Sequence, residues 1–149
     1  MSPTITIKHS IRVAVSPETL WDFTQDFNKR HLWDASIIKV EPLTSINGKS
    51  VRITFFGRQE ATLTYKIEKR PEKTTLEMHD VKSRVIVRGG GHWSYQEQQR
   101  DTIWTQVNSI VVKEGWLIRV FMPLIRYVFH QNTKRSMKNA KRIVEAFDQ

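Results

Sequence analysis

WLIRVFMPLIRYVFHQNTKRSMKNAKRIVEAF, residues 116–147, is the stretch that decides the fold. Residues at spacings of three and four predict a helix with one buried face, made of Phe121, Ile125, Val128, Asn132, Ser136, Ala140, Ile143 and Phe147. The opposite face carries Lys134, Arg135, Lys138, Lys141 and Arg142. The buried face is apolar at its ends and polar at Asn132 and Ser136. Because buried polar groups need partners, its middle is expected to face a cavity.

The totals predict one domain, residues 1–149, with an ordinary globular composition and no disulfides, since cysteine is absent. The start, MSPTITIKHS, lacks a signal-peptide pattern, and the most apolar stretch, residues 115–129, is interrupted by Arg119 and Arg126. We therefore expect a cytoplasmic protein without stable membrane insertion. The net charge of +9 is spread along the chain. A solvated surface is favoured, with anionic membrane or RNA contact through the basic helix face as the alternative.

The N-terminal part predicts one strand and two short helices. Apolar residues alternate with others over residues 5–15, the period of a half-buried strand. Ser16, Pro17 and Glu18 then supply a capping hydroxyl, a proline at the first helical position and an acid in the first turn. This helix is expected to run to about Phe27. A shorter helical piece follows through His31–Trp33.

From Ser36 the period changes to two, which predicts six more strands, near residues 37–44, 50–57, 60–69, 74–80, 84–98 and 102–113. Their short connections imply antiparallel pairing and contain Asn47-Gly48, Gly57-Arg58, Arg70-Pro71-Glu72-Lys73, Asp80-Val81-Lys82 and Gln99-Arg100-Asp101. The run Gly89-Gly90-Gly91 inside a strand predicts a bulge or sharp bend.

This order, with SPETLWDFTQDFNKRHLWDASIIKVEPL (residues 16–43) after the first strand, resembles the START-like, or SRPBCC, superfamily. The Arg70-Pro71 corner and Asp101-Thr102 at the last hairpin add to the resemblance, which covers essentially the whole chain. It implies an α+β helix-grip fold: a seven-stranded antiparallel sheet wrapped around the long C-terminal helix, with two short helices between strands one and two. It also implies a cavity between sheet and helix that often holds a hydrophobic small molecule.

Strand parity indicates which side chains point into that grip. The inward sets are Val51, Ile53 and Phe55; Leu63, Tyr65 and Ile67; Leu76 and Met78; and Trp93 and Tyr95. On the last strand, apolarity weakly favours the face that begins at Ile103. The family pattern favours the other face, which we adopt: Trp104, Gln106, Asn108, Ile110 and Val112.

The predicted ligand-binding residues combine an apolar and aromatic wall with a few amides and hydroxyls. They are Phe55, Tyr65, Met78, Trp93, Tyr95, Trp104, Gln106, Asn108, Val128, Asn132 and Ser136. The alternative is a filled core in which these polar groups satisfy one another.

Candidates for chemistry are few. The five histidines form no metal-binding motif, and cysteine is absent, so we expect neither a metal nor an organic cofactor. General acid–base catalysis would need a histidine or carboxylate aimed into the cavity. By parity, His9, Asp80 and Glu97 are the weak candidates.

The sequence favours a carrier or sensor of a hydrophobic or amphipathic small molecule, or a lipid. Two alternatives stay open. One is a polyketide cyclase, dehydrase or aromatase-like enzyme. The other is a peripheral protein that delivers a lipid or quinone, or a ribosome-associated one, using the basic helix face.

Overall fold

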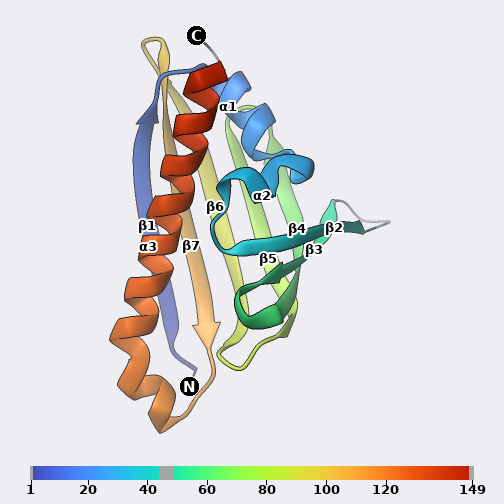
Figure 1. The fold of residues 1–149 in the computed structure, drawn as a ribbon, viewed down its shortest axis with the longest axis vertical. Coiled ribbons are helices and arrows are strands. Elements are labelled where there is room, and N and C mark those ends of the chain that lie inside the picture. The colour runs from blue at the N-terminus through green and yellow to red at the C-terminus, as the bar shows by residue number, and fades with distance from the viewer. Residues whose placement is uncertain (1, 44–48, 148–149) are drawn as a thin grey trace.

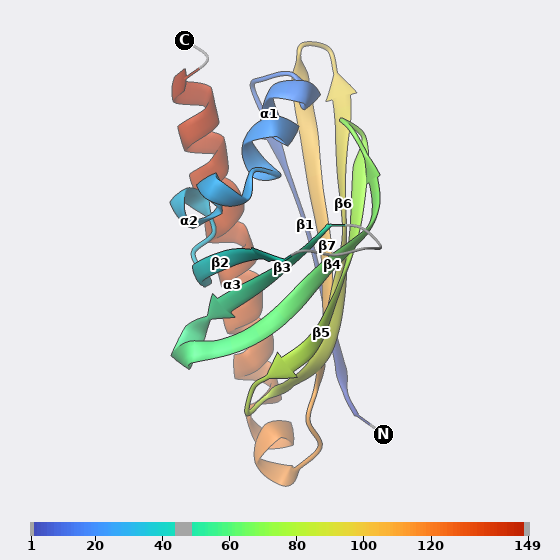
Figure 2. The ribbon, with the colours of Figure 1, turned by 90° about the vertical axis from the view of Figure 1, so that its right-hand side faces the viewer.

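Seven antiparallel strands form one sheet that curls against a long helix (Figures 1 and 2). The computed structural model describes residues 2–43 and 49–147. In these ranges the strands are β1 (Thr4–Val13), β2 (Ile37–Leu43), β3 (Ser50–Phe55), β4 (Gln59–Lys69), β5 (Lys73–Lys82), β6 (Ile86–Gln98) and β7 (Asp101–Val112). Their order is β1-β7-β6-β5-β4-β3-β2. The helices are α1 (Pro17–Thr24), α2 (Arg30–Trp33) and α3 (Trp116–Phe147). The predicted α+β helix-grip fold is confirmed.

The connection from β1 to β2 holds α1, a 3-10 turn (Phe27–Lys29) and α2. As predicted, the Ser16 hydroxyl caps α1 by accepting a hydrogen bond from the Thr19 backbone amide at 3.2 Å. The helix ends at Thr24, earlier than expected, because Asp26 caps the next turn by accepting from the Asn28 amide at 2.9 Å. This early stop lets the chain turn so that α2 packs against α3.

Side chains of the strands face the side of the sheet that was predicted, except after two bulges. β7 buries Thr102, Trp104, Gln106, Ile110 and Val112, so the predicted face of this strand is confirmed. The ladder between β4 and β5 shifts register between Tyr65 and Ile67, and Ile67, predicted to point inward, is exposed. It shifts again opposite Glu60, where Asp80 has a φ of 50°. There Val81 packs on the core in place of Asp80.

The predicted turns are mostly confirmed, with one correction. A turn was expected at Asp80-Val81-Lys82, but β5 continues through Lys82. The Asn47-Gly48 turn lies outside the described residues. Gly57, with a φ of 66°, forms the predicted connection between β3 and β4 together with Arg58.

Of the bulge or sharp bend predicted at Gly89-Gly90-Gly91, the bulge is wrong, because these residues pair in regular register with β5 and β7. The glycines instead make room. A Cβ on Gly89 would lie 2.7 Å from the Ser109 carbonyl oxygen, and one on Gly91 would collide with Asn108 Oδ1. A side chain on Gly89 would therefore push the β7 backbone away, whereas one on Gly91 would displace the Asn108 side chain.

Helix α3 has two unlike halves. Its buried residues all come from the second half: Thr133, Ser136, Met137, Ala140 and Val144. The predicted buried face is wrong at Phe121, Val128 and Phe147, which are exposed. For Phe121 the reason is visible in Figure 2, where the first turns of α3 project past the end of the sheet, whereas Phe147 is the last residue of the helix. Side-chain hydrogen bonds hold the second half, as when Lys141 Nζ donates to the Arg12 carbonyl at 2.6 Å.

The core contains an aromatic cluster that includes Trp33 of α2. The rings of Trp33, Trp93 and Trp104 are mutually within 6.0 Å, centroid to centroid, and Tyr95 stacks on Trp104. Such pairs add stability beyond the area that they bury. A second, smaller cluster of Ile5, Ile7, Ile110 and Val112 supports the first half of α3. Among the described residues, none of the helices has the length and hydropathy of a bilayer-crossing segment.

Candidate functional site

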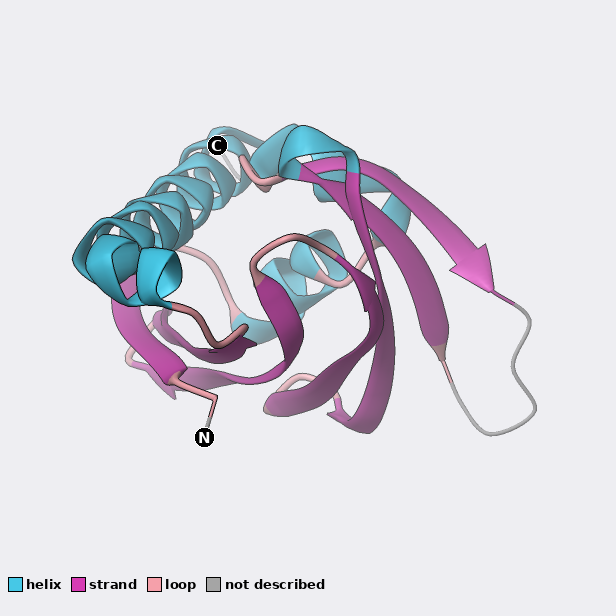
Figure 3. Cartoon of the chain, turned by 90° about the horizontal axis from the view of Figure 1, so that it is seen from below, coloured by secondary structure: helices cyan, strands magenta, loops and turns pink. Residues whose placement is uncertain are grey.

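A cavity of about 420 Å³ lies between the curled sheet, α2 and α3. Seen from below, the strands and α3 surround this region (Figure 3). Its walls come from α2 and the following residues, from β3 to β7, and from α3. Gly90, in the middle of the glycine run, is one of the lining residues, so the missing side chain adds to the space. The two charged residues on the described wall are Arg30 and Asp34, and they pair with each other.

Eight of the predicted ligand-binding residues lie on this wall: Phe55, Met78, Trp93, Gln106, Asn108, Val128, Asn132 and Ser136. The other three, Tyr65, Tyr95 and Trp104, are buried in the aromatic core instead. The Tyr95 hydroxyl accepts a hydrogen bond from Gln25 Nε2 at 2.8 Å, and burial raises its pKa. These three side chains support the wall from behind.

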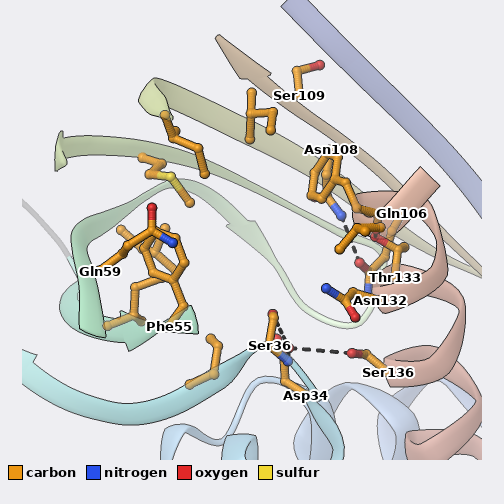
Figure 4. Close-up of a pocket in the computed structure, with 18 of the residues that line it drawn as sticks. Asp34, Ser36, Phe55, Gln59, Gln106, Asn108, Ser109, Asn132, Thr133 and Ser136 are labelled. Carbon is orange, nitrogen blue, oxygen red and sulfur yellow. Dashed lines mark hydrogen bonds between the residues drawn. The ribbon is translucent and has the colours of Figure 1, made fainter. Parts of the chain in front are cut away.

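A chain of hydrogen bonds fixes the amides on β7 (Figure 4). The Trp93 indole Nε1 can only donate, and it donates to Asn108 Oδ1 at 2.9 Å. Asn108 must therefore offer its Nδ2, which donates to Gln106 Oε1 at 2.9 Å. This leaves Gln106 Nε2 as the outer end of the chain. It is buried and has no hydrogen-bond partner among the described residues.

An unpartnered buried donor costs about 1–3 kcal/mol of desolvation, so Gln106 Nε2 needs an acceptor. Gln106 is 4% exposed and lines the cavity. Figure 4 shows Asn132 and Thr133 of α3 close to it. The Thr133 hydroxyl donates to the Phe129 carbonyl at 3.1 Å, and its oxygen does not accept a hydrogen bond from Gln106 Nε2. A guest with a carbonyl or hydroxyl oxygen could satisfy the Gln106 amide.

The buried ion pair gives the opposite wall a fixed polar group. Arg30 Nε donates to Asp34 Oδ2 at 2.8 Å, and both side chains are less than one tenth exposed. The guanidinium lies over the rings of Trp33 and Trp93, at 4.8 and 4.9 Å from their centroids. Burial is the largest single influence and lowers the pKa of Arg30, but Asp34, Tyr65 and Tyr95 together outweigh it, so the net result is a raised Arg30 pKa. Arg30 therefore stays charged.

Asp34 also ties the ion pair to α3. Its Oδ1 accepts hydrogen bonds from the Ser36 hydroxyl at 2.7 Å and from the Ser136 hydroxyl at 3.4 Å. Ser136 Oγ in turn accepts from the Ala35 backbone amide at 2.9 Å. Ser136 thus joins α3 to the segment after α2, and its buried hydroxyl is satisfied within the protein.

The three candidates for acid–base chemistry lie outside this cavity. Asp80 is exposed and lies 3.0 Å from His79 Nδ1, because the bulge turns it away from the core. Glu97 is exposed near the β6–β7 hairpin, although its partner across the strands, Thr102, is buried. The expectation that Asp80 and Glu97 point into the cavity is therefore wrong. His9 faces α3 from β1 and does not belong to the cavity wall.

We expect His9 to make stability depend on pH. Its pKa is lowered by partial burial first, and then by His130, Lys134 and Lys138 of α3. Below the unfolded-state His9 pKa of about 6.5, the imidazole binds a proton in the unfolded chain more readily than in the folded protein. The free energy of unfolding therefore decreases as the pH is lowered from the unfolded-state pKa to the folded-state pKa. Urea midpoints at pH 7.5 and pH 5.5 will test this.

The His9→Gln variant serves as the comparison, and it should lose less stability than the wild type over this interval. Equal losses in the two proteins would contradict the assignment to His9.

Sequence reasoning missed Arg30 and Asp34, as well as Thr133. The signal for the ion pair was present, since opposite charges four residues apart on a helix face each other. Charged residues are rarely buried, so nothing in the local sequence placed this pair on a cavity wall. Thr133 was missed because the predicted buried face of the helix passed through Asn132, whereas the next residue, Thr133, is the buried one.

Comparison with solved structures finds the same fold at low sequence identity. The Zhui aromatase/cyclase from Streptomyces sp. R1128 has a TM-score of 0.82 and 13% identity over 99% of this chain and 97% of that chain. A START superfamily protein from Mycobacterium smegmatis has a TM-score of 0.77 and 14% identity over 96% and 99%. A protein from Thermus thermophilus has a TM-score of 0.82 and 10% identity over 97% and 99%. At these identities the likeness shows the fold alone.

A comparison with curated proteins finds no match. A family model, described as polyketide cyclase / dehydrase and lipid transport, matches residues 4–145. This match covers nearly the whole chain and agrees with the START-like resemblance drawn from residues 16–43. The chain belongs to the polyketide cyclase / dehydrase and lipid transport family.

Proposed function

We propose that the protein binds a neutral, amphipathic small molecule in the cavity between the sheet and α3, as a carrier or sensor. The observation that carries the proposal is the buried, unpartnered Gln106 Nε2 on an otherwise mostly apolar wall. The cavity volume lies within the range of about 300–1,000 Å³ that is typical of ligand pockets. The family description supports binding of this kind.

The wall favours an uncharged guest. Arg30 and Asp34 neutralise each other at 2.8 Å, which leaves no net charge on the described part of the wall to attract an ion. The apolar area provides most of the affinity through burial. The Gln106 amide sets the orientation by donating to one oxygen of the guest, since buried polar contacts specify rather than drive such binding.

Titration with the uncharged fluorophore N-phenylnaphthylamine, together with native mass spectrometry of gently purified protein, tests the proposal. We expect saturable binding of one molecule. The Asn132→Trp variant, which fills the cavity from α3, should weaken it at least about tenfold. Absence of saturable binding, together with absence of any retained small molecule, would contradict the proposal.

A second variant separates orientation from burial. Gln106→Leu removes the free donor and should weaken binding of a carbonyl-bearing guest about fivefold to tenfold, with little effect on a hydrocarbon analogue. Thr105→Val is the matched control, because Thr105 is the next residue on β7 and bonds to Ser10 across the strands. Equal effects of the two variants would show that Gln106 has no special role.

A cyclase-like activity is the second candidate. The family description and the aromatase/cyclase fold neighbour favour it, as does the presence of two side chains with donor groups, Arg30 and Gln106, on the cavity wall. Such donors stabilise negative charge that develops on a carbonyl oxygen, and the enclosed wall holds a flexible chain in a reactive shape. Turnover of a linear poly-β-ketone that falls in Gln106→Leu by much more than the affinity for the same compound would identify an enzyme rather than a carrier.

A further inference from the structure

The first half of α3 exposes an unusually apolar surface. Seven of its large side chains are between 43% and 73% exposed: Trp116, Leu117, Val120, Phe121, Leu124, Tyr127 and Val128. At the helical repeat these positions lie away from the four that pack on the sheet: Ile118, Met122, Ile125 and Phe129. Contiguous exposed patches of this kind usually mark an interaction site. We call these seven residues the apolar band.

The same face of α3 becomes basic in its second half. Lys134, Lys138 and Arg142 continue the outward line of the apolar band, since they stand at helical spacing from Trp116, Val120 and Tyr127. The helix carries seven lysines and arginines and one acidic residue, Glu145. The Glu145 carboxylate accepts hydrogen bonds from Lys141 Nζ and from the Ala14 backbone amide. The outward face of the second half is therefore strongly positive.

The side of the apolar band is also basic. Arg119 and Arg126 are seven residues apart and so lie on one flank of the helix, beside the exposed apolar side chains. Trp116 and Tyr127, within the band, are the residue types that settle at the boundary between water and acyl chains. Apolar side chains flanked by arginines are the pattern of a helix that lies in a membrane interface.

We propose that the outward face of α3 docks the protein on an anionic lipid bilayer, with the apolar band among the acyl chains and the basic half on the headgroups. An RNA partner would meet the basic half but leave the apolar band in water. A second copy could cover the apolar band with its own band, but the basic half of each helix would then stay without an anionic partner. An anionic bilayer offers an apolar layer and a negative layer side by side, as this face requires.

The docking face borders the candidate pocket. Leu124 and Val128 belong to the apolar band and also line the cavity, so they stand at its rim. A docked protein would therefore present this rim to the bilayer, and a lipid-soluble guest could pass between the two without crossing water. This last step rests on the proposed function, whereas docking itself does not.

Trp116 provides a direct readout of docking. The other four tryptophans (Trp21, Trp33, Trp93 and Trp104) are at most 5% exposed, whereas Trp116 is 73% exposed. On mixing with phosphatidylcholine vesicles that contain about one third phosphatidylserine, tryptophan emission should shift to shorter wavelength and be quenched by brominated acyl chains. Trp116→Phe should abolish both changes while binding, followed by co-sedimentation, persists.

Two pairs of variants test the two halves separately. Val120→Ser should weaken vesicle binding, whereas Ile38→Ser should not, although each residue is 63% exposed. Arg135→Glu with Lys138→Glu should weaken binding at least about tenfold, and raising salt from about 0.05 M to 0.5 M should do the same. Lys8→Glu with Arg100→Glu changes the net charge equally at exposed positions away from α3 and should have a small effect.

Several results would overturn the proposal. These are no vesicle binding at low salt, equal loss in the test and control variants, or Trp116 burial in a dimer detected by ultracentrifugation without vesicles. RNA binding in the absence of vesicle binding would also overturn it. The Asn132→Trp variant distinguishes failure of vesicle docking from failure of ligand binding in the cavity. It should no longer bind N-phenylnaphthylamine in the cavity but should still bind vesicles.

Discussion

Replacing Asp34 by leucine is expected to lower the free energy of unfolding by about 3–5 kcal/mol. The substitution leaves the Arg30 guanidinium in a buried site, between two tryptophan rings, without the carboxylate 2.8 Å away that neutralises it. It also removes the acceptor for Ser36 and Ser136. Urea unfolding followed by circular dichroism measures the loss.

The double variant Arg30→Met with Asp34→Leu is the control for this prediction. It removes both charges and fills similar volume, so it should recover most of the lost stability. A deficit of about 1–2 kcal/mol should remain from the missing hydrogen bonds. If the single variant unfolds like the wild type, or the double variant is as unstable as the single one, the ion pair does not stabilise this wall.

Replacing Trp104 by alanine is expected to cost about 3–5 kcal/mol, because its side chain is fully buried and contacts three other aromatic rings. The void would also loosen the support behind Trp93, which holds the Asn108 and Gln106 amides. The N-phenylnaphthylamine affinity should therefore fall together with the urea midpoint.

Trp116→Ala is a matched control for this second prediction, because the same substitution is made at an exposed position. Its effect on unfolding should stay within about 0.5 kcal/mol. Similar losses in the two variants would mean that the aromatic cluster around Trp104 adds nothing beyond general helix or sheet propensity.

Most of the fold could be predicted because its periodicities are long and regular. Seven strands with period two and one helix with period 3.6 leave few ways to bury every apolar face. The inward face of β7 could be predicted only with the family pattern, since Ile103 and its neighbours were slightly more apolar than the face that is buried. On β7, the position of the strand in the fold decides which face is buried, and the difference in apolarity between the two faces does not.

The errors have local physical causes. A single residue inserted into a ladder reverses every later parity, which is why Asp80 faces solvent and Val81 faces the core. A bulge of this kind leaves little trace in the sequence, since Asp80 is an ordinary strand-end residue. The helix face failed at Phe121 and Val128 for another reason: periodicity locates an apolar face, but not whether a sheet reaches far enough to cover it.

The candidate site was predicted where polar residues interrupt an apolar face, as at Gln106, Asn108 and Asn132. It was missed where charge is buried, at Arg30 and Asp34, because propensity and hydropathy both assign such residues to the surface. Tyr65, Tyr95 and Trp104 show the converse. Aromatic side chains on the correct face of a strand can lie behind a wall rather than on it.

The unequal anchoring of α3 has a consequence for how a guest could enter. In the described chain, the side-chain hydrogen bonds from α3 to other elements begin at Ser136. The turns before it are held by the contacts of Ile118, Met122, Ile125 and Phe129, by the ring contact of His130 with His9 and by the burial of Thr133. Contacts of this type yield gradually and re-form without a specific geometry. The rim of the cavity at Leu124 and Val128 therefore belongs to a segment that can be displaced. The aromatic cluster around Trp104, and the polar groups fixed to it, remain in place during such a displacement.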